Sequence, residues 1–240
     1  IAELNRHDLK FVITLGDVID RKLESFDDIM PIYGQVKAPT RFVLGNHDFS
    51  VSDEDKGKVL GKLGMEKSYR SETIGDWVFL SLDGTDVSPY RHPKNHPGTI
   101  AARELRNDLA KTAQRKLPPW GGAMSQTQLA WFAAELEKAK TAHKRVIVFN
   151  HVPVFPLRDG YNLWNDEEVV ALIAKHPQVV AYLNGHRHKG NYAVNQGCHY
   201  LNFKGMVETP DRSAYAVMRC FPDRIEVEGY QTEPDRTCKF

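Results

Sequence analysis

The segment VVAYLNGHRH, residues 179–188, passes from an apolar run into two histidines that are two positions apart. Side chains alternate along an extended chain, so residues two apart point to the same side. His186 and His188 can therefore face one point just beyond the end of a strand. An isolated pair of this kind more often belongs to a polar loop of solvated histidines, so the neighbouring segments must distinguish the two interpretations.

Three other apolar runs end in a similar way. The runs FVITL (11–15), RFVL (41–44) and RVIVF (145–149) lead into the segments GDVID, GNHD and NH. Apolar runs without alternation are typical of strands that are buried on both faces. In open α/β sheets, ligands bind at the carboxyl ends of the strands. Solvated loops would not place a candidate ligand at all four strand ends, so the pattern favours a functional site.

The side chains at these four ends are carboxylates, an amide and imidazoles. Together they form a mixed oxygen and nitrogen set that suits divalent transition metals such as Mn, Fe or Zn. The glycines that precede several of them let the backbone turn sharply after a strand. The candidates are Asp17, Asp20, Asn46, His47, His151, His186 and His188.

Helical patterns lie between the apolar runs, and the last part of the chain is rich in strands. Ser125 is a suitable N-cap for a helix that starts at residue 126, and acidic residues open a second helix at 166–175. The segments 199–203, 214–221 and 224–230 predict strands, the last two joined as a hairpin. This order predicts one α/β (α+β) domain over residues 1–240, with two packed sheets and helices outside.

Residues 83–99 hold three prolines and two histidines and predict a long loop, and a charged helical pattern follows at 102–117. Loops of this length inside a compact domain are usually functional or disordered. The apolar runs before and after this segment belong to one alternation of strands and helices. We therefore expect residues 83–120 to form an inserted loop and helix near the active site.

Composition and charge exclude several classes of protein. The 240 residues carry a net charge of +1 with both signs interspersed, so no basic stripe predicts nucleic acid as a partner. No apolar stretch is long enough to cross a membrane. Three cysteines without C-x-x-C spacing predict free thiols of a reducing compartment, and hence a cytoplasmic protein. The first residue is not Met, which leaves a cleaved export signal open, and the sequence does not fix the oligomeric state.

The motifs G-D-x-x-D, G-N-H-D, N-H and G-H-x-H, in this order, resemble those of the calcineurin-like metallophosphoesterases. The resemblance implies a four-layer αββα sandwich of two mixed sheets flanked by helices, with two metal ions at the strand ends. It implies that Asp17 bridges both ions, that Asn46, His151 and His186 complete one site, and that His188 binds the other ion. It places His47 beside the scissile phosphate, with Asp20 holding its tautomer.

This resemblance implies hydrolysis of phosphoric esters or anhydrides. Two divalent ions lower the pKa of a bridging water, which becomes the attacking hydroxide, and they hold the phosphoryl oxygens during in-line attack. A protein nucleophile is then not required. The sequence contains no G-x-S-x-G, C-x₅-R or G-x-x-x-x-G-K-[ST] motif that would supply a competing mechanism.

A narrower resemblance covers nearly the whole chain. The segments WGGAMSQTQLAWF, FNHVPVFP, LWN, GHRHKGNY and LNFKGMVETPDRSAYAV resemble the manganese-dependent ADP-ribose/CDP-alcohol diphosphatase family. Members of that family split pyrophosphate bonds in nucleoside-diphosphate substrates, which implies Mn²⁺ and a small phosphorylated substrate. Trp164 and Asn165 are candidate substrate-binding residues. So is Arg21, for which a surface salt bridge is the alternative. Asn191 replaces a glycine that is usual in that family.

The superfamily begins with a strand that carries D-x-H, or D-x-Q in the narrower family. Ten residues precede the run FVITL, and His7 and Asp8 among them stand in the wrong order for this motif. We therefore expect the second metal site, with His188 and Asp17, to lack two ligands. Either the first strand is absent from the chain or the second ion binds weakly.

Two alternatives to a pyrophosphatase remain open. One is a phosphomonoesterase or cyclic-nucleotide phosphodiesterase that uses the same dimetal centre. The other is a non-catalytic binding module with a degenerate metal site. A nuclease is disfavoured by the balanced charge, and a purple acid phosphatase by the absence of its tyrosine ligand, because Asp20 stands near that place.

Overall fold

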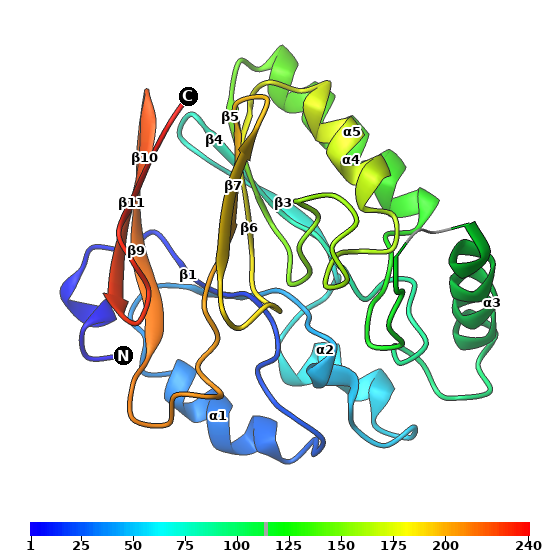
Figure 1. The fold of residues 1–240 in the computed structure, drawn as a ribbon. Coiled ribbons are helices and arrows are strands. Elements are labelled where there is room, and N and C mark those ends of the chain that lie inside the picture. Colours follow the sequence, from blue (N-terminus) through cyan, green and yellow to red (C-terminus); the bar gives the residue numbers. More distant parts are fainter. Residues whose placement is uncertain (113–114) are drawn as a thin grey trace.

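A six-stranded mixed sheet forms the centre of the computed structural model, which describes residues 1–112 and 115–240 (Figure 1). Its strands follow the order β3-β4-β5-β6-β8-β7, with the bounds β3 Arg70–Ile74, β4 Trp77–Ser81, β5 Arg145–Phe149, β6 Val179–Asn184, β7 Asn191–Asn195 and β8 Cys198–Asn202. The inner pairs are parallel and both edge pairs are antiparallel. The central strands β5 and β6 are almost entirely buried, which explains their unbroken apolar sequences.

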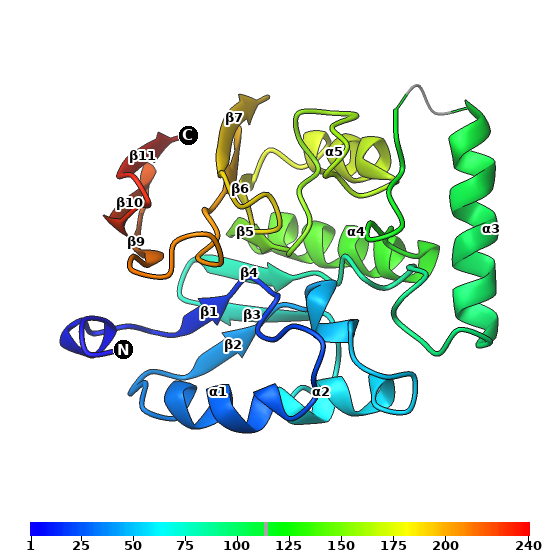
Figure 2. The same ribbon diagram turned by 60° about the horizontal axis from the view of Figure 1, so that its bottom comes forward.

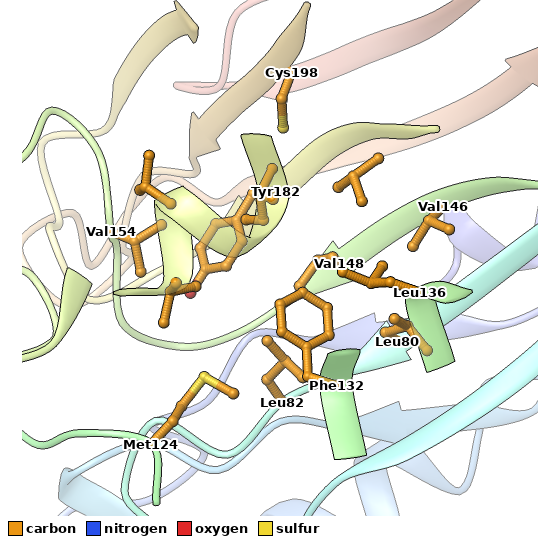
Figure 3. Close-up of a cluster of buried hydrophobic side chains, with 14 of the residues drawn as sticks. Leu80, Leu82, Met124, Phe132, Leu136, Val146, Val148, Val154, Tyr182 and Cys198 are labelled. Atoms are coloured by element: carbon orange, nitrogen blue, oxygen red, sulfur yellow. The ribbon is translucent and has the colours of Figure 1, made fainter. Parts of the chain in front are cut away.

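Helices α4 (Gln126–Thr141) and α5 (Asp166–Ala174) cover one face of this sheet. The hydroxyl of Ser125 accepts a hydrogen bond from the Gln128 backbone N–H at 3.2 Å, so the predicted N-cap is confirmed. A buried apolar cluster fills the space between the helices and the sheet (Figure 3). Its members include Leu80, Phe132, Leu136, Val148 and Tyr182.

A second layer of strands packs on the other face of the six-stranded sheet. It consists of a parallel pair, β1 (Val12–Thr14) with β2 (Thr40–Phe42), and an antiparallel triplet. The triplet comprises β9 Ala214–Phe221, β10 Arg224–Gln231 and β11 Arg236–Lys239, and the predicted hairpin joins its first two strands. Between β1 and β9 lies a largely apolar groove of about 880 Å³, which we call the β1–β9 groove.

The outer face of β1 and β2 is covered by α1 (Ser25–Tyr33) and α2 (Val59–Lys62), on the opposite side of the molecule from α4 and α5 (Figures 1 and 2). Three short 3₁₀ helices complete this part of the chain: η1 Leu4–Arg6, η2 His47–Phe49 and η3 Lys56–Lys58. The four predicted layers are therefore confirmed, although the second sheet is divided into two hydrogen-bonded pieces.

Helix α3 (Pro97–Thr112) stands at the edge of the molecule in both views. It begins earlier than the pattern at 102–117 predicts, with Pro97 at its start, where a missing N–H does no harm. Residues 113–114 of that pattern lie outside the described part of the chain. The three cysteines are free thiols. Among the described helices, none is long and apolar enough to span a membrane.

Candidate metal centre

Four of the predicted ligands converge where β1, β2, β5 and β6 end. The Nε2 atom of His151 is 3.2 Å from Asn46 Oδ1, 3.1 Å from Asp17 Oδ2 and 3.0 Å from His186 Nδ1. The ligand atoms of Asp17, His151 and His186 all lie within 4.8 Å of one another. The parallel strands thus bring together side chains from four distant segments of the sequence at one edge.

The chemistry of this donor set fits a cation. His151 Nδ1 donates to the Leu15 carbonyl at 2.7 Å, so in the neutral ring its Nε2 carries a lone pair. The Asn46 and Asp17 oxygens that face this atom can only accept hydrogen bonds. A proton on Nε2 would satisfy one or two of these neighbours, whereas a divalent metal ion can satisfy the whole set. These residues therefore fit a divalent metal.

The charges of the three titratable ligands respond to burial and to one another. Burial lowers the pKa of His186 to about 3, which keeps its imidazole neutral and able to bind a metal. Burial alone would lower the pKa of His151, but the adjacent Asp17 carboxylate outweighs it and the net pKa is raised. In turn, the attraction of His151 overcomes the burial of Asp17 and holds the pKa of that carboxyl well below its usual range.

The backbone around the ligands has little freedom. Asp17 and His186 both have left-handed conformations, with φ of 55° and 67°, which non-glycine residues adopt rarely. A Cβ atom on Gly45 would lie 2.1 Å from Asp17 Oδ1, so only glycine lets the second ligand loop approach the first this closely.

Asp48 holds these loops together and was not predicted as a site residue. It is fully buried, and its two oxygens accept hydrogen bonds from four backbone N–H groups at 2.8–3.2 Å. The donors are Asp17, Val18, Ile19 and Gly45. Burial raises the pKa of Asp48 to about 6, so it remains a carboxylate at neutral pH. Its place directly after the G-N-H motif was the available sequence signal.

His47 lies beside this centre and contacts Asp20. Its backbone N–H donates to Asp17 Oδ1 at 2.8 Å, and its Nδ1 is 2.8 Å from Asp20 Oδ1. The hydrogen bond from His47 lowers the pKa of Asp20. Arg21 is exposed and pairs with the other Asp20 oxygen at 2.6 Å, which is the surface salt bridge that the sequence left as its alternative role. The structure thus brings His47, Asp20 and Arg21 into one chain of contacts.

His188 lies outside the tight cluster, but it lines the β1–β9 groove together with Asp17. Its Nδ1 is 2.5 Å from Glu208 Oε1. Because a carboxylate accepts, this contact places the proton on Nδ1 and leaves Nε2 free to bind a metal. Glu208 was not predicted, and its only sequence signal was its position in the segment KGMVETP.

The other two predicted substrate-binding residues contact the interior. Trp164 is buried in a small apolar cluster with Leu117 and Ala123. The side-chain amide of Asn165 accepts from the Met124 N–H at 3.2 Å and donates to the Met124 carbonyl at 3.0 Å. Their roles toward a substrate stay predictions.

Comparison with known proteins gives one consistent family. A family model described as calcineurin-like phosphoesterase matches residues 1–190. Proteins named manganese-dependent ADP-ribose/CDP-alcohol diphosphatase from Arabidopsis thaliana and Homo sapiens are 29% and 24% identical to this chain. These matches cover 94% and 95% of this chain and 80% and 78% of the relatives. Both the family and these relatives indicate a hydrolase.

A solved structure described as a dimetal phosphatase from Danio rerio has the same fold. It superposes with a TM-score of 0.87 at 23% sequence identity, and the match covers 100% of this chain and 86% of that one. The match of the family model over most of the sequence, together with the ligand cluster at the strand ends, leads to one assignment: the chain belongs to the calcineurin-like phosphoesterase family.

Proposed function

We propose that this protein hydrolyses the pyrophosphate bond of small nucleoside-diphosphate substrates of the ADP-ribose or CDP-alcohol type, with two divalent metal ions, preferably Mn²⁺. The observation that carries the proposal is the convergence of Asp17, Asn46 and His186 on the Nε2 atom of His151. The names of the relatives in plants and animals supply the substrate type and the metal. The free cysteines support a reducing compartment such as the cytoplasm.

In the proposed hydrolysis, some residues of the chain bind metal and others act on the substrate. Bound divalent ions supply positive charge for the phosphoryl oxygens and lower the pKa of an attacking water. Asp17, Asn46, His151 and His186 would hold one ion. His47, whose Nδ1–H is held by Asp20, presents Nε2 as the group that stabilises or protonates the leaving phosphate oxygen.

We further propose that one additional strand fills the β1–β9 groove and carries the remaining ligands of the second ion. Among the described strands, β1 pairs with β2 alone and β9 with β10 alone, so each turns one unpaired edge to the groove. Apolar side chains such as Phe79 and Phe149 line it, and Asp17 and His188 lie along the same groove.

A longer protein that adds such a strand upstream of Ile1 should bind a second Mn²⁺ and turn over faster than the 240-residue chain, because His188 and Asp17 alone hold a second ion poorly. Titration calorimetry with Mn²⁺ and turnover at saturating Mn²⁺ measure the difference. Two ions per 240-residue chain with equal turnover would refute the proposal.

The proposed activity has a direct test. Incubation with ADP-ribose or CDP-choline and Mn²⁺ should yield AMP with ribose 5-phosphate, or CMP with phosphocholine, and chelation of the metal should stop both reactions. Parallel reactions with AMP and a cyclic nucleotide separate the alternatives. If AMP or the cyclic nucleotide is hydrolysed faster than ADP-ribose and CDP-choline, the protein is a phosphomonoesterase or a cyclic-nucleotide phosphodiesterase instead. Hydrolysis of none of these four compounds would contradict the proposal.

A further inference from the structure

Two exposed aromatic side chains gather around the metal-ligand candidate His186. The ring centroids of Trp120 and Tyr161 lie 5.0 Å and 6.1 Å from that of His186, and 5.5 Å from each other. Trp120 is 37% exposed and Tyr161 is 44% exposed. Large apolar side chains that remain accessible next to a polar site are typical of ligand-binding surfaces. We call this pair the aromatic wall.

The backbone of the loop that carries Trp120 is constrained by contacts with neighbouring segments. A Cβ atom on Gly122 would lie 2.5 Å from the Gly84 carbonyl oxygen, so the loop is pressed against its neighbour. The backbone N–H of Trp164 donates to the Gly122 carbonyl at 2.8 Å. Trp164 thus supports the loop that carries Trp120, and the backbone of this loop is held in place before any ligand binds.

Tyr161 is fixed from its own side. The Asp159 carboxylate accepts from the Tyr161 N–H at 3.0 Å and pairs with Arg187 at 2.8 Å. The Arg187 guanidinium lies over the Tyr161 ring, 5.5 Å from its centroid, which is the geometry of a cation–π contact. Arg187 therefore occupies a face of the Tyr161 ring, whereas no Arg or Lys among the described residues lies over the ring of Trp120.

The spacing of the wall determines how a flat ligand can bind. A ring inserted between two others needs roughly 7 Å, twice the contact distance of aromatic carbons. Trp120 and Tyr161 are closer than this, so a planar group must lie on the outer face of the wall. In a nucleotide, one sugar separates the phosphate from the base. A phosphate bound at the metal centre near His186 would therefore leave the base close to Trp120, which is adjacent to His186.

We propose that the aromatic wall binds the nucleobase of the substrate by stacking, with Trp120 as the principal contact. The inference rests on the proposed function, which supplies a substrate with a base near the phosphate. Stacking accepts every base because each has a π-face. The aromatic wall can therefore bind adenine and cytosine alike, and the base raises the affinity for the substrate without selection for one base over another.

Binding of the products tests the inference without any hydrolysis. In the presence of Mn²⁺, Trp120→Ala should weaken binding of AMP and CMP by about 5- to 160-fold, the range for one stacked base. Binding of ribose 5-phosphate, which has the phosphate but no base, should change less than about twofold. Trp120→Phe should restore most of the affinity, because a phenyl ring also stacks. Titration calorimetry measures all three ligands.

Tyr69→Ala is a matched control, because Tyr69 forms a similar pair with Trp131, at 4.7 Å, in a part of the chain that carries none of the ligands. This variant should bind all three ligands as the unmodified chain does. Equal weakening of AMP and ribose 5-phosphate in Trp120→Ala, or no weakening of either, would overturn the inference. Binding of AMP through Trp120 without hydrolysis of ADP-ribose would reject the proposed function alone, and hydrolysis that is indifferent to Trp120→Ala would reject the wall alone.

Discussion

Alanine in place of His47 should lower kcat by about 10²–10⁴, the range for a positioned acid–base group, while the metal remains bound. The side chain that is lost contacts Asp20 and none of the four converging ligand atoms. The backbone N–H of residue 47, which donates to Asp17 Oδ1, is retained in the variant. The position of Asp17 and the affinity for the metal should therefore be unchanged in the variant.

Measurement of kcat together with Mn²⁺ content distinguishes the roles of His47. His143→Asn, at an exposed histidine just after α4, is a suitable control that should leave both quantities unchanged. Loss of the metal in His47→Ala would identify His47 as a ligand and contradict the role that we assign to it.

Alanine in place of His151 should lower Mn²⁺ affinity by at least about tenfold and abolish most of the activity. The other three ligand atoms all lie around His151 Nε2, so its removal takes away the atom that they share. It also leaves the Leu15 carbonyl without the donor that it has at 2.7 Å. Calorimetric titration with Mn²⁺ measures the loss.

His176→Ala provides a matched control for the loss of a buried imidazole. His176 is also buried, and it contacts the Leu172 carbonyl and Glu137 at the surface of the helical layer. Both variants should have a lower free energy of unfolding, because each leaves a cavity and a broken hydrogen bond. Only His151→Ala should lose metal affinity. Unchanged stoichiometry and affinity in that variant would show that His151 is not a ligand.

The central strands could be predicted from the sequence because burial on both faces leaves a plain signal. The apolar runs at 145–149 and 179–183 correspond to β5 and β6 to within one residue. The edge strands β3 and β7 alternate between half-buried and exposed residues, and their sequences RSETI and NYAVN resemble loops. Helix α1 was missed as well, since Pro31 argues against a helix interior.

The ligand set could be predicted for a related reason, because each ligand lies within four residues after the end of a strand. Asp48 was not, because its partners are backbone N–H groups, which leave no trace in side-chain patterns. Trp120 and Tyr161 meet His186 only through the packing of three separate loops. Spacing along the chain carries no information about such contacts. The gap between β1 and β9 was expected only from the family resemblance, as a missing strand.

The four hydrogen bonds of Asp48 bear on which positions can drift during evolution. Every donor is a main-chain amide, so the side chains of Val18 and Ile19 play no part in the way Asp48 positions their loop. Substitutions there can accumulate under the demands of apolar packing alone, without displacing Asp17. At position 48 even an isosteric amide would turn an N–H toward other N–H groups. Genetic variation at Val18 and Ile19 should therefore be limited only by apolar packing, whereas variation at Asp48, which anchors their backbone, should be nearly absent.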